Sequence, residues 1–206
     1  DNTTIDSFKS LLEKDSDDYF LKNLYSLNVE SLLFELFSAS FPDDRRVAMS
    51  GELLLNICRT MGQLSDQLLP LYTSEHSEKV AKTAFEMAGH LHISSAQQGQ
   101  LLLAGYLHDL GMLSVPLNIL RKYDSLTKDQ WIHVHDHVRL SQEVIKQIPG
   151  FSHITVWIGE HHERMNGSGY PARLRGHEIS VAGRILAIAD VYSALTSPRP
   201  YRTHAY

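Results

Sequence analysis

Histidine and aspartate residues are grouped at five widely separated places in this chain of 206 residues. The gaps between successive groups are 32, 29, 24 and 28 residues, which suits one group per helix in a bundle of α-helices. The candidate ligands are His76, the pair His108–Asp109, His137, the pair His161–His162, and Asp190. Imidazole and carboxylate groups bind Fe, Mn or Zn, and seven of them are too many for one tetrahedral ion. The pattern therefore predicts two metal ions bridged by a carboxylate.

Two of these groups lie in strongly apolar sequence. His108 and Asp109 follow the run LLLAGYL, where Gly111 is expected to end a helix, and Asp190 lies inside RILAIADVYSAL. A carboxylate buried in such surroundings is costly unless a metal or an opposite charge compensates it. The other seven histidines are interpreted as ordinary surface or core residues. These are His90, His92, His133, His135, His153, His177 and His204.

Five segments of the chain follow one another in a distinctive order. They are HSEKVA from His76, LHDLG from Leu107, HVRLS from His137, HHERMNGSGYP from His161, and RILAIADVYSALTSPRPYR from Arg184. In order and spacing they resemble the motifs of the HD-GYP family, a branch of the HD-domain metallophosphohydrolases. The resemblance covers residues 69–206.

The resemblance implies a metal-dependent phosphodiesterase that hydrolyses the second messenger cyclic di-GMP through a metal-activated water. Asp109 would bridge the two ions and is the expected catalytic carboxylate. One ion would bind mainly His76, His108 and Asp190, and the other mainly His137, His161 and His162. Fe is the expected metal, with Mn as the alternative.

Three further residues are expected to contact the substrate. Tyr170 in the GYP motif offers an aromatic face and a hydroxyl, although a packing role is the alternative. Arg199 and Arg202 in RPYR could bind phosphate oxygens bidentately or form structural salt bridges. Tyr170 would lie in a loop formed by NGSGYP, where Asn166 replaces the usual aspartate.

Departures from the family pattern bear on the activity. Met112 stands where the family has a lysine, and methionine offers neither charge nor a hydrogen-bond donor. Tyr72 replaces a glutamate of trinuclear members, which favours two ions, and Ser193 replaces a common aspartate. Val138 and Ser141 replace a proline and a glycine. The alternatives are a catalytically weakened module that binds cyclic di-GMP or a partner protein, and an HD-type phosphohydrolase acting on another nucleotide.

The expected fold is all-α, an HD-domain-like helical bundle preceded by a helical module. Residues 1–68 read as a regulatory or dimerising module that contacts a second copy or a signalling partner, and residues 69–206 as an HD-GYP domain cut short at its C-terminal end. Helical spacing of apolar residues marks segments in both parts. The predicted helices are 5–12, 29–37, 45–69, 76–91, one ending at 108–109, 128–148, and 184–195.

Composition excludes several other classes. Cys58 is the only cysteine, so no internal disulfide can form, which suits a reducing, cytoplasmic setting. No apolar stretch approaches the ~20 residues of a membrane span, and the polar N-terminus does not resemble a signal peptide. No basic run indicates binding to extended nucleic acid. Residues 1–70 carry a net charge of −6 and residues 71–206 a net charge of +1. Bound divalent cations would make the second part more positive locally, which favours an anionic substrate there.

Overall fold

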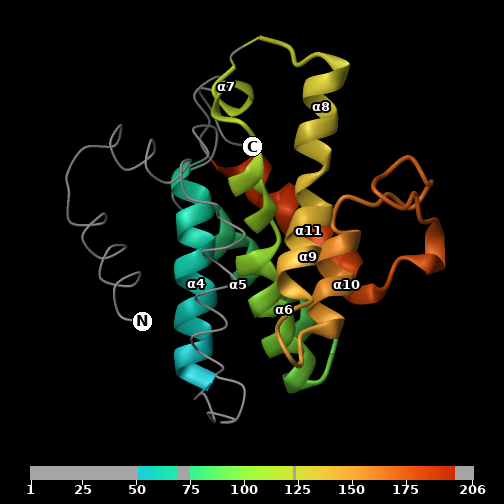
Figure 1. Ribbon diagram of the computed structural model, residues 1–206. Coiled ribbons are helices and arrows are strands. Elements are labelled where there is room, and N and C mark those ends of the chain that lie inside the picture. Colours follow the sequence, from blue (N-terminus) through green and yellow to red (C-terminus); the bar gives the residue numbers. More distant parts are fainter. Residues whose placement is uncertain (1–50, 69–74, 123, 198–206) are drawn as a thin grey trace, which may run out of the picture. The chain divides into compact units, whose positions relative to one another are not determined.

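The computed structural model of this chain describes residues 51–68, 75–122 and 124–197 (Figure 1). The helices predicted for residues 5–12 and 29–37 lie outside this part, as do Tyr72, Arg199, Arg202 and His204. Chain contacts divide the protein into two compact units, residues 1–49 and residues 50–206. All the helices discussed below belong to the second unit.

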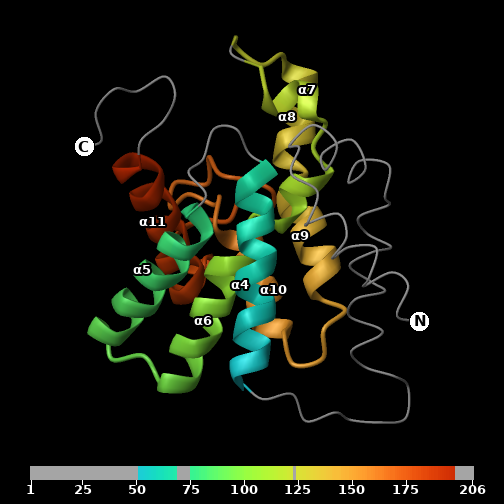
Figure 2. The same ribbon diagram turned by 90° about the vertical axis from the view of Figure 1, so that its left-hand side faces the viewer.

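Five helices form the bundle that carries the candidate ligands (Figures 1 and 2). Helix α5 packs against α6 and α11, and α10 packs against α6, α9 and α11. Small residues allow close contact: a Cβ atom on Gly105 of α6 would lie 2.3 Å from the Cα of Ala81 on α5. The bounds are α5 His76–His90, α6 Ser95–Leu107, α9 His137–Ile145, α10 Ser152–Glu160 and α11 Val181–Thr196.

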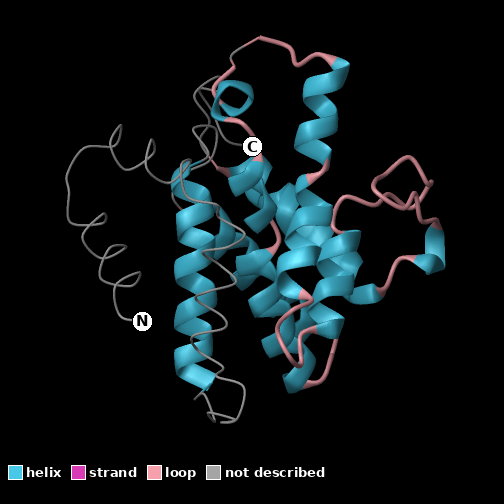
Figure 3. Cartoon of the chain, viewed as in Figure 1, coloured by secondary structure: helices cyan, strands magenta, loops and turns pink. Residues whose placement is uncertain are grey.

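Helices are the only regular elements in the part of the chain that the structure describes (Figure 3). A single isolated β-bridge joins Asn166 to Arg175. The prediction of an all-α fold is confirmed. None of the described helices is both long and apolar enough to cross a lipid bilayer.

Helix α4 (Gly51–Leu68) packs against α5, α6 and the short 3₁₀ helix η1 (Leu110–Ser114). Its buried side comprises residues that recur at helical spacing: Cys58, Met61, Gly62, Ser65 and Asp66. The sequence places this helix in the module of residues 1–68, whereas its contacts place it with the helices that follow. The regulatory or dimerising role of the N-terminal segment stays a prediction.

The prediction of a single helix over residues 128–148 is wrong, because the segment forms two helices that meet at Asp136. The buried residues of α9 fit against η1 and α10, but this buried face does not continue into α8 (Lys128–His135), which contains no buried residue. A capping box of Thr127 and Gln130 starts α8. A further short helix, α7 (Leu117–Leu120), precedes α8.

Candidate metal centre

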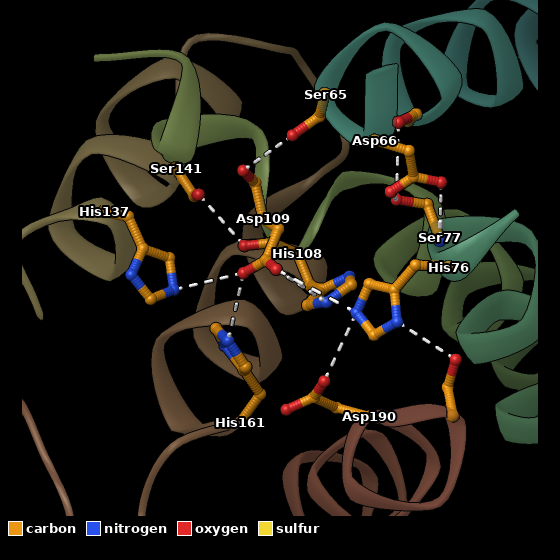
Figure 4. A network of polar contacts seen from close by, with 12 residues as sticks. Ser65, Asp66, His76, Ser77, His108, Asp109, His137, Ser141, His161 and Asp190 are labelled. Atoms are coloured by element: carbon orange, nitrogen blue, oxygen red, sulfur yellow. Dashed lines mark hydrogen bonds and ion pairs between the residues drawn. The ribbon is translucent and has the colours of Figure 1, made fainter. Parts of the chain in front are cut away.

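The ends of several helices meet in one largely buried cluster that contains all seven predicted metal ligands. Figure 4 shows six of them, all except His162. Position in the helices explains how they meet. His76 and His137 are the first residues of α5 and α9, while His108 and His161 directly follow the last residues of α6 and α10. Asp109 comes between α6 and η1, and only Asp190 lies within a long helix, α11.

The Asp109 carboxylate lies at the centre of the cluster. Its Oδ1 is 3.1 Å from Nε2 of His137 and 3.7 Å from Nε2 of His161. Its Oδ2 is 3.4 Å from Nε2 of His108 and 4.0 Å from Nε2 of His76. Each oxygen therefore faces a different pair of imidazoles, as a bridging carboxylate would.

Asp190 and His162 are the two remaining candidate ligands of the cluster. Asp190 Oδ1 is 3.4 Å from His76 Nε2, and its Oδ2 is 4.0 Å from His162 Nδ1. The ligand atoms form two groups that share Asp109, and within each group they lie within 4.8 Å of one another. One group is His76, His108 and Asp109, and the other is Asp109, His137, His161 and His162.

The proton positions on three imidazoles suit a metal. The Nδ1 atoms of His108, His137 and His161 lie 2.8, 2.5 and 2.6 Å from backbone carbonyl oxygens three residues earlier. A carbonyl oxygen only accepts hydrogen bonds, so Nδ1 must donate, and in the neutral ring Nε2 then presents a lone pair to the centre. These three Nε2 atoms and Asp109 Oδ1 are buried and have no hydrogen-bond partner among the described residues.

Acceptor atoms thus face one another across the cluster. A carboxylate oxygen and an imidazole lone pair a little over 3 Å apart repel each other unless a cation or a proton lies between them. A backbone carbonyl that fixes the second ring nitrogen is the usual support of a metal-bound histidine. The residues present therefore fit divalent ions.

His76 has a different support from the other three. Its Nδ1 lies 3.0 Å from Oγ of Ser193, the residue that replaces a common aspartate of the family. A hydroxyl can donate or accept, so Ser193 does not fix the tautomer of His76 as a carboxylate would.

Electrostatics in the metal-free cluster favour a bound proton. Although burial opposes it, the adjacent Asp109 carboxylate raises the pKa of His108 to about 9. Burial alone would raise the pKa of Asp109, but the surrounding imidazoles hold it well below its usual value. Burial and the neighbouring histidines lower the pKa of His162, and burial lowers that of His161. Protons and metal ions would therefore compete for the same atoms, above all at His108.

The ring of Tyr170 stacks on two imidazoles. Its centroid is 3.9 Å from that of His135 and 4.8 Å from that of His162, with interplanar angles of 20° and 30°. The Tyr170 ring therefore stacks on two histidines, one of which, His162, is a candidate metal ligand. Its contact with a substrate stays a prediction. The sequence analysis interprets His135 as an ordinary surface or core residue, but its side chain connects α8 to the GYP loop through this contact.

Two buried glutamates, which the sequence analysis does not identify, fix the loop that carries Tyr170. Glu163 accepts hydrogen bonds from the backbone N–H groups of Ala172, Arg173 and Leu174, at 2.7, 2.9 and 3.0 Å. Glu160 accepts from the backbone N–H and the hydroxyl of Ser180, at the start of α11. Glu160 directly precedes the His161–His162 pair and Glu163 directly follows it. This proximity to the candidate ligands was the feature of the sequence that could have identified them.

Two of the residues that depart from the family pattern, Met112 and Ser141, have defined structural roles. Met112 packs in an apolar cluster with Val115, Ile119 and Leu120, and is 8% exposed. The Ser141 hydroxyl donates to the backbone carbonyl of His108 and accepts from Gly111 N–H, at 2.9 and 2.8 Å.

His137 and Gly111 both lie where η1 and α9 meet. His137 is buried and His133 is exposed, which agrees with the choice of His137 as the candidate ligand. Gly111 does not end a helix, because α6 already ends at Leu107. A Cβ atom at Gly111 would instead lie 2.1 Å from the backbone oxygen of His137, so glycine permits η1 to approach α9.

Comparison with known proteins relates this geometry to a family. The model of the family described as HD domain matches residues 57–205. Over 175 residues the chain is 35% identical to 3'3'-cGAMP-specific phosphodiesterase 1 of Vibrio cholerae, covering 85% of this chain and 40% of that protein. Over 135 residues it is 35% identical to cyclic di-GMP phosphodiesterase response regulator RpfG of Xanthomonas campestris pv. campestris, covering 63% of this chain and 35% of that protein.

The chain spans less than half the length of these curated relatives. Among solved structures, Bd1817, a HDG"Y"P protein from Bdellovibrio bacteriovorus, matches with a TM-score of 0.53 at 19% identity. The match covers 86% of this chain and 56% of that one, and it shows a shared fold. From the family match, the motifs and the relatives together, this chain belongs to the HD-domain family and to its HD-GYP branch.

Proposed function

We propose that this chain is a metal-dependent phosphodiesterase that hydrolyses cyclic di-GMP. The observation that carries the proposal is the Asp109 carboxylate, whose two oxygens face different pairs of imidazole Nε2 atoms. The relatives support the choice of substrate class, since they are named as phosphodiesterases for 3'3'-cGAMP or cyclic di-GMP.

The ligand set proposed for each ion follows the two groups. One ion would be held by His76, His108, Asp109 and Asp190, and the other by Asp109, His137, His161 and His162. Mixed imidazole and carboxylate ligands suit Fe, Mn and Zn alike. The resemblance to the HD-GYP family implies Fe, with Mn as the alternative. Two such ions would stabilise negative charge on a phosphate and lower the pKa of water enough for attack at phosphorus.

The residues of the chain itself would orient and shield this chemistry. The side chains of His76, His108 and His161 are fully buried, whereas those of Asp190 and His162 are 11% and 20% exposed. The open side of the cluster is therefore the side of Asp190 and His162, where a phosphodiester would enter. Arg199 and Arg202, which follow α11 in the sequence, are proposed to bind the phosphate oxygens.

A specific observation favours one alternative. Met112 offers no charge and is buried in an apolar cluster, at the position where the family presents a lysine. A catalytically weakened module that binds cyclic di-GMP, or a partner protein, as a regulator is the second candidate function.

One experiment separates these functions. Protein purified without oxygen is analysed for metal content and incubated with cyclic di-GMP and, separately, with 3'3'-cGAMP. Products are quantified by chromatography, and binding of each nucleotide is titrated in parallel. Turnover of cyclic di-GMP that is lost with a chelator and restored by Fe or Mn supports the proposal. Binding without turnover supports the regulatory module, and turnover of 3'3'-cGAMP alone would change the substrate.

A further inference from the structure

Helix α4 reaches the metal centre with two buried polar residues, Ser65 and Asp66 (Figure 4). We propose that Ser65 and Asp66 are positioning residues of this centre, which hold the backbone that carries Asp109 and His76. The inference rests on the proposed function in so far as the cluster binds metal ions. It assigns part of the site to a helix that the sequence places in a separate module.

Ser65 acts on the segment that carries Asp109. Its hydroxyl donates to the backbone carbonyl oxygen of Asp109 at 3.0 Å, and both residues are buried. The Ser141 hydroxyl makes the corresponding bond to the preceding carbonyl, that of His108, at 2.9 Å. Hydroxyls from α4 and α9 therefore fix the two successive carbonyl groups of the His108–Asp109 pair, which restricts how the Asp109 side chain can be directed.

Asp66 acts on the start of α5, where His76 is the first residue. The N-cap residue of α5, Glu75, makes no capping hydrogen bond with its side chain. Asp66 instead accepts from the backbone N–H of Ser77 at 2.9 Å and from its hydroxyl at 2.7 Å. A carboxylate at this position satisfies an otherwise unpaired amide of the first turn and interacts favourably with the helix dipole. Asp66 thus does from a neighbouring helix what a capping residue does locally.

Close packing fixes α4 relative to both segments. A Cβ atom on Gly62 would lie 2.5 Å from the backbone oxygen of Tyr106 and 3.0 Å from Cβ of Ser77. These contact points lie two residues before His108 and one residue after His76. Because α4 contacts the chain so close to these ligands, a displacement of this helix would move them as well.

The test compares Mn²⁺ affinity, by titration calorimetry, with stability, by thermal unfolding of the full chain. Ser65→Ala and Asp66→Ala should weaken Mn²⁺ binding about ten- to a hundred-fold, as loss of residues that orient ligands typically does. Asp66→Asn should retain most of the affinity, because its amide oxygen can still accept from Ser77 N–H. Gln67→Ala, at an exposed position of the same helix, is the matched control and should bind as wild type.

A second control separates positioning from general loosening. Cys58→Ala removes a buried side chain of α4 two turns away, so it should lower the unfolding temperature and leave Mn²⁺ affinity unchanged. Wild-type affinity in Ser65→Ala and Asp66→Ala, or an equal loss in Cys58→Ala, overturns this inference alone. Wild-type protein that binds no Mn²⁺ overturns the proposed metal centre and this inference with it.

Discussion

The loop that carries Tyr170 depends on the Glu163 carboxylate, and Glu163→Gln tests this directly. Glu163 is 3% exposed and accepts three backbone hydrogen bonds, two at Oε1 and one at Oε2. Glutamine keeps one acceptor oxygen, but its amide NH₂ must face at least one of the backbone N–H donors. One buried donor then loses its partner, and the remaining bonds lose the assistance of the charge.

The magnitude follows from these three bonds. An unsatisfied buried donor costs about 1–3 kcal/mol, and a bond to a charged group is worth about 1 kcal/mol more than a neutral one. The loop should therefore lose about 3–5 kcal/mol of local stability. Since every 1.4 kcal/mol is a factor of ten, the open state should become roughly a hundred- to several-thousand-fold more populated.

Limited digestion with trypsin measures this opening, because the loop contains exposed arginines at 164, 173 and 175. When reclosing is fast, the cleavage rate follows the open population. Glu178→Gln is the matched control, since Glu178 is exposed and its carboxylate accepts one backbone hydrogen bond, from Arg175 N–H in the same loop. Cleavage of Glu163→Gln at the wild-type rate would refute the assignment of Glu163 as the anchor of the loop.

Three further outcomes are expected from the geometry of the centre. Asp109→Asn should deplete both ions, because it removes the shared charge; normal metal content by elemental analysis would show that Asp109 does not bridge. Mn²⁺ binding near pH 8 should release a proton, because the adjacent Asp109 carboxylate raises the pKa of His108 to about 9. The affinity for Mn²⁺ should therefore rise with pH up to that value. A heat of binding that does not vary with the ionisation enthalpy of the buffer would contradict this. Met112→Lys should raise turnover of cyclic di-GMP about ten- to a hundred-fold by adding a charge-assisted hydrogen bond, and should lower the unfolding temperature because Met112 is buried among apolar residues. Unchanged turnover in a variant that retains both ions would show that this position does not limit the reaction.

The candidate ligands were predictable because their chemistry constrains residue type and helix position together. A carboxylate such as Asp190 within an apolar helix is unusual enough to identify from sequence alone. The helical class followed in the same way from apolar spacing. The break at Asp136 was not predictable, because it depends on which part of the 128–148 segment finds a packing surface.

The supporting residues were harder to predict because their roles depend on distant partners. Ser65 and Asp66 are polar residues on the buried face of a helix, which is unusual enough to notice in the sequence. Their partners, Asp109 and Ser77, follow 44 and 11 residues later, so the sequence does not reveal what they bind. His135 resembles its neighbour His133 in sequence, and only the folded loop places Tyr170 against it. Sequence patterns therefore predicted the residues that could bind metal better than the residues that hold them in place.

Anomalous diffraction from crystals grown with Mn²⁺ tests the central claim, a binuclear centre bridged by Asp109, most directly. A map calculated from data at the Mn absorption edge should contain two strong peaks per chain, both in contact with Asp109. One peak should lie against His76 and His108, and the other against His137, His161 and His162. A single peak, a third fully occupied peak, or two peaks that do not share Asp109 would contradict the account.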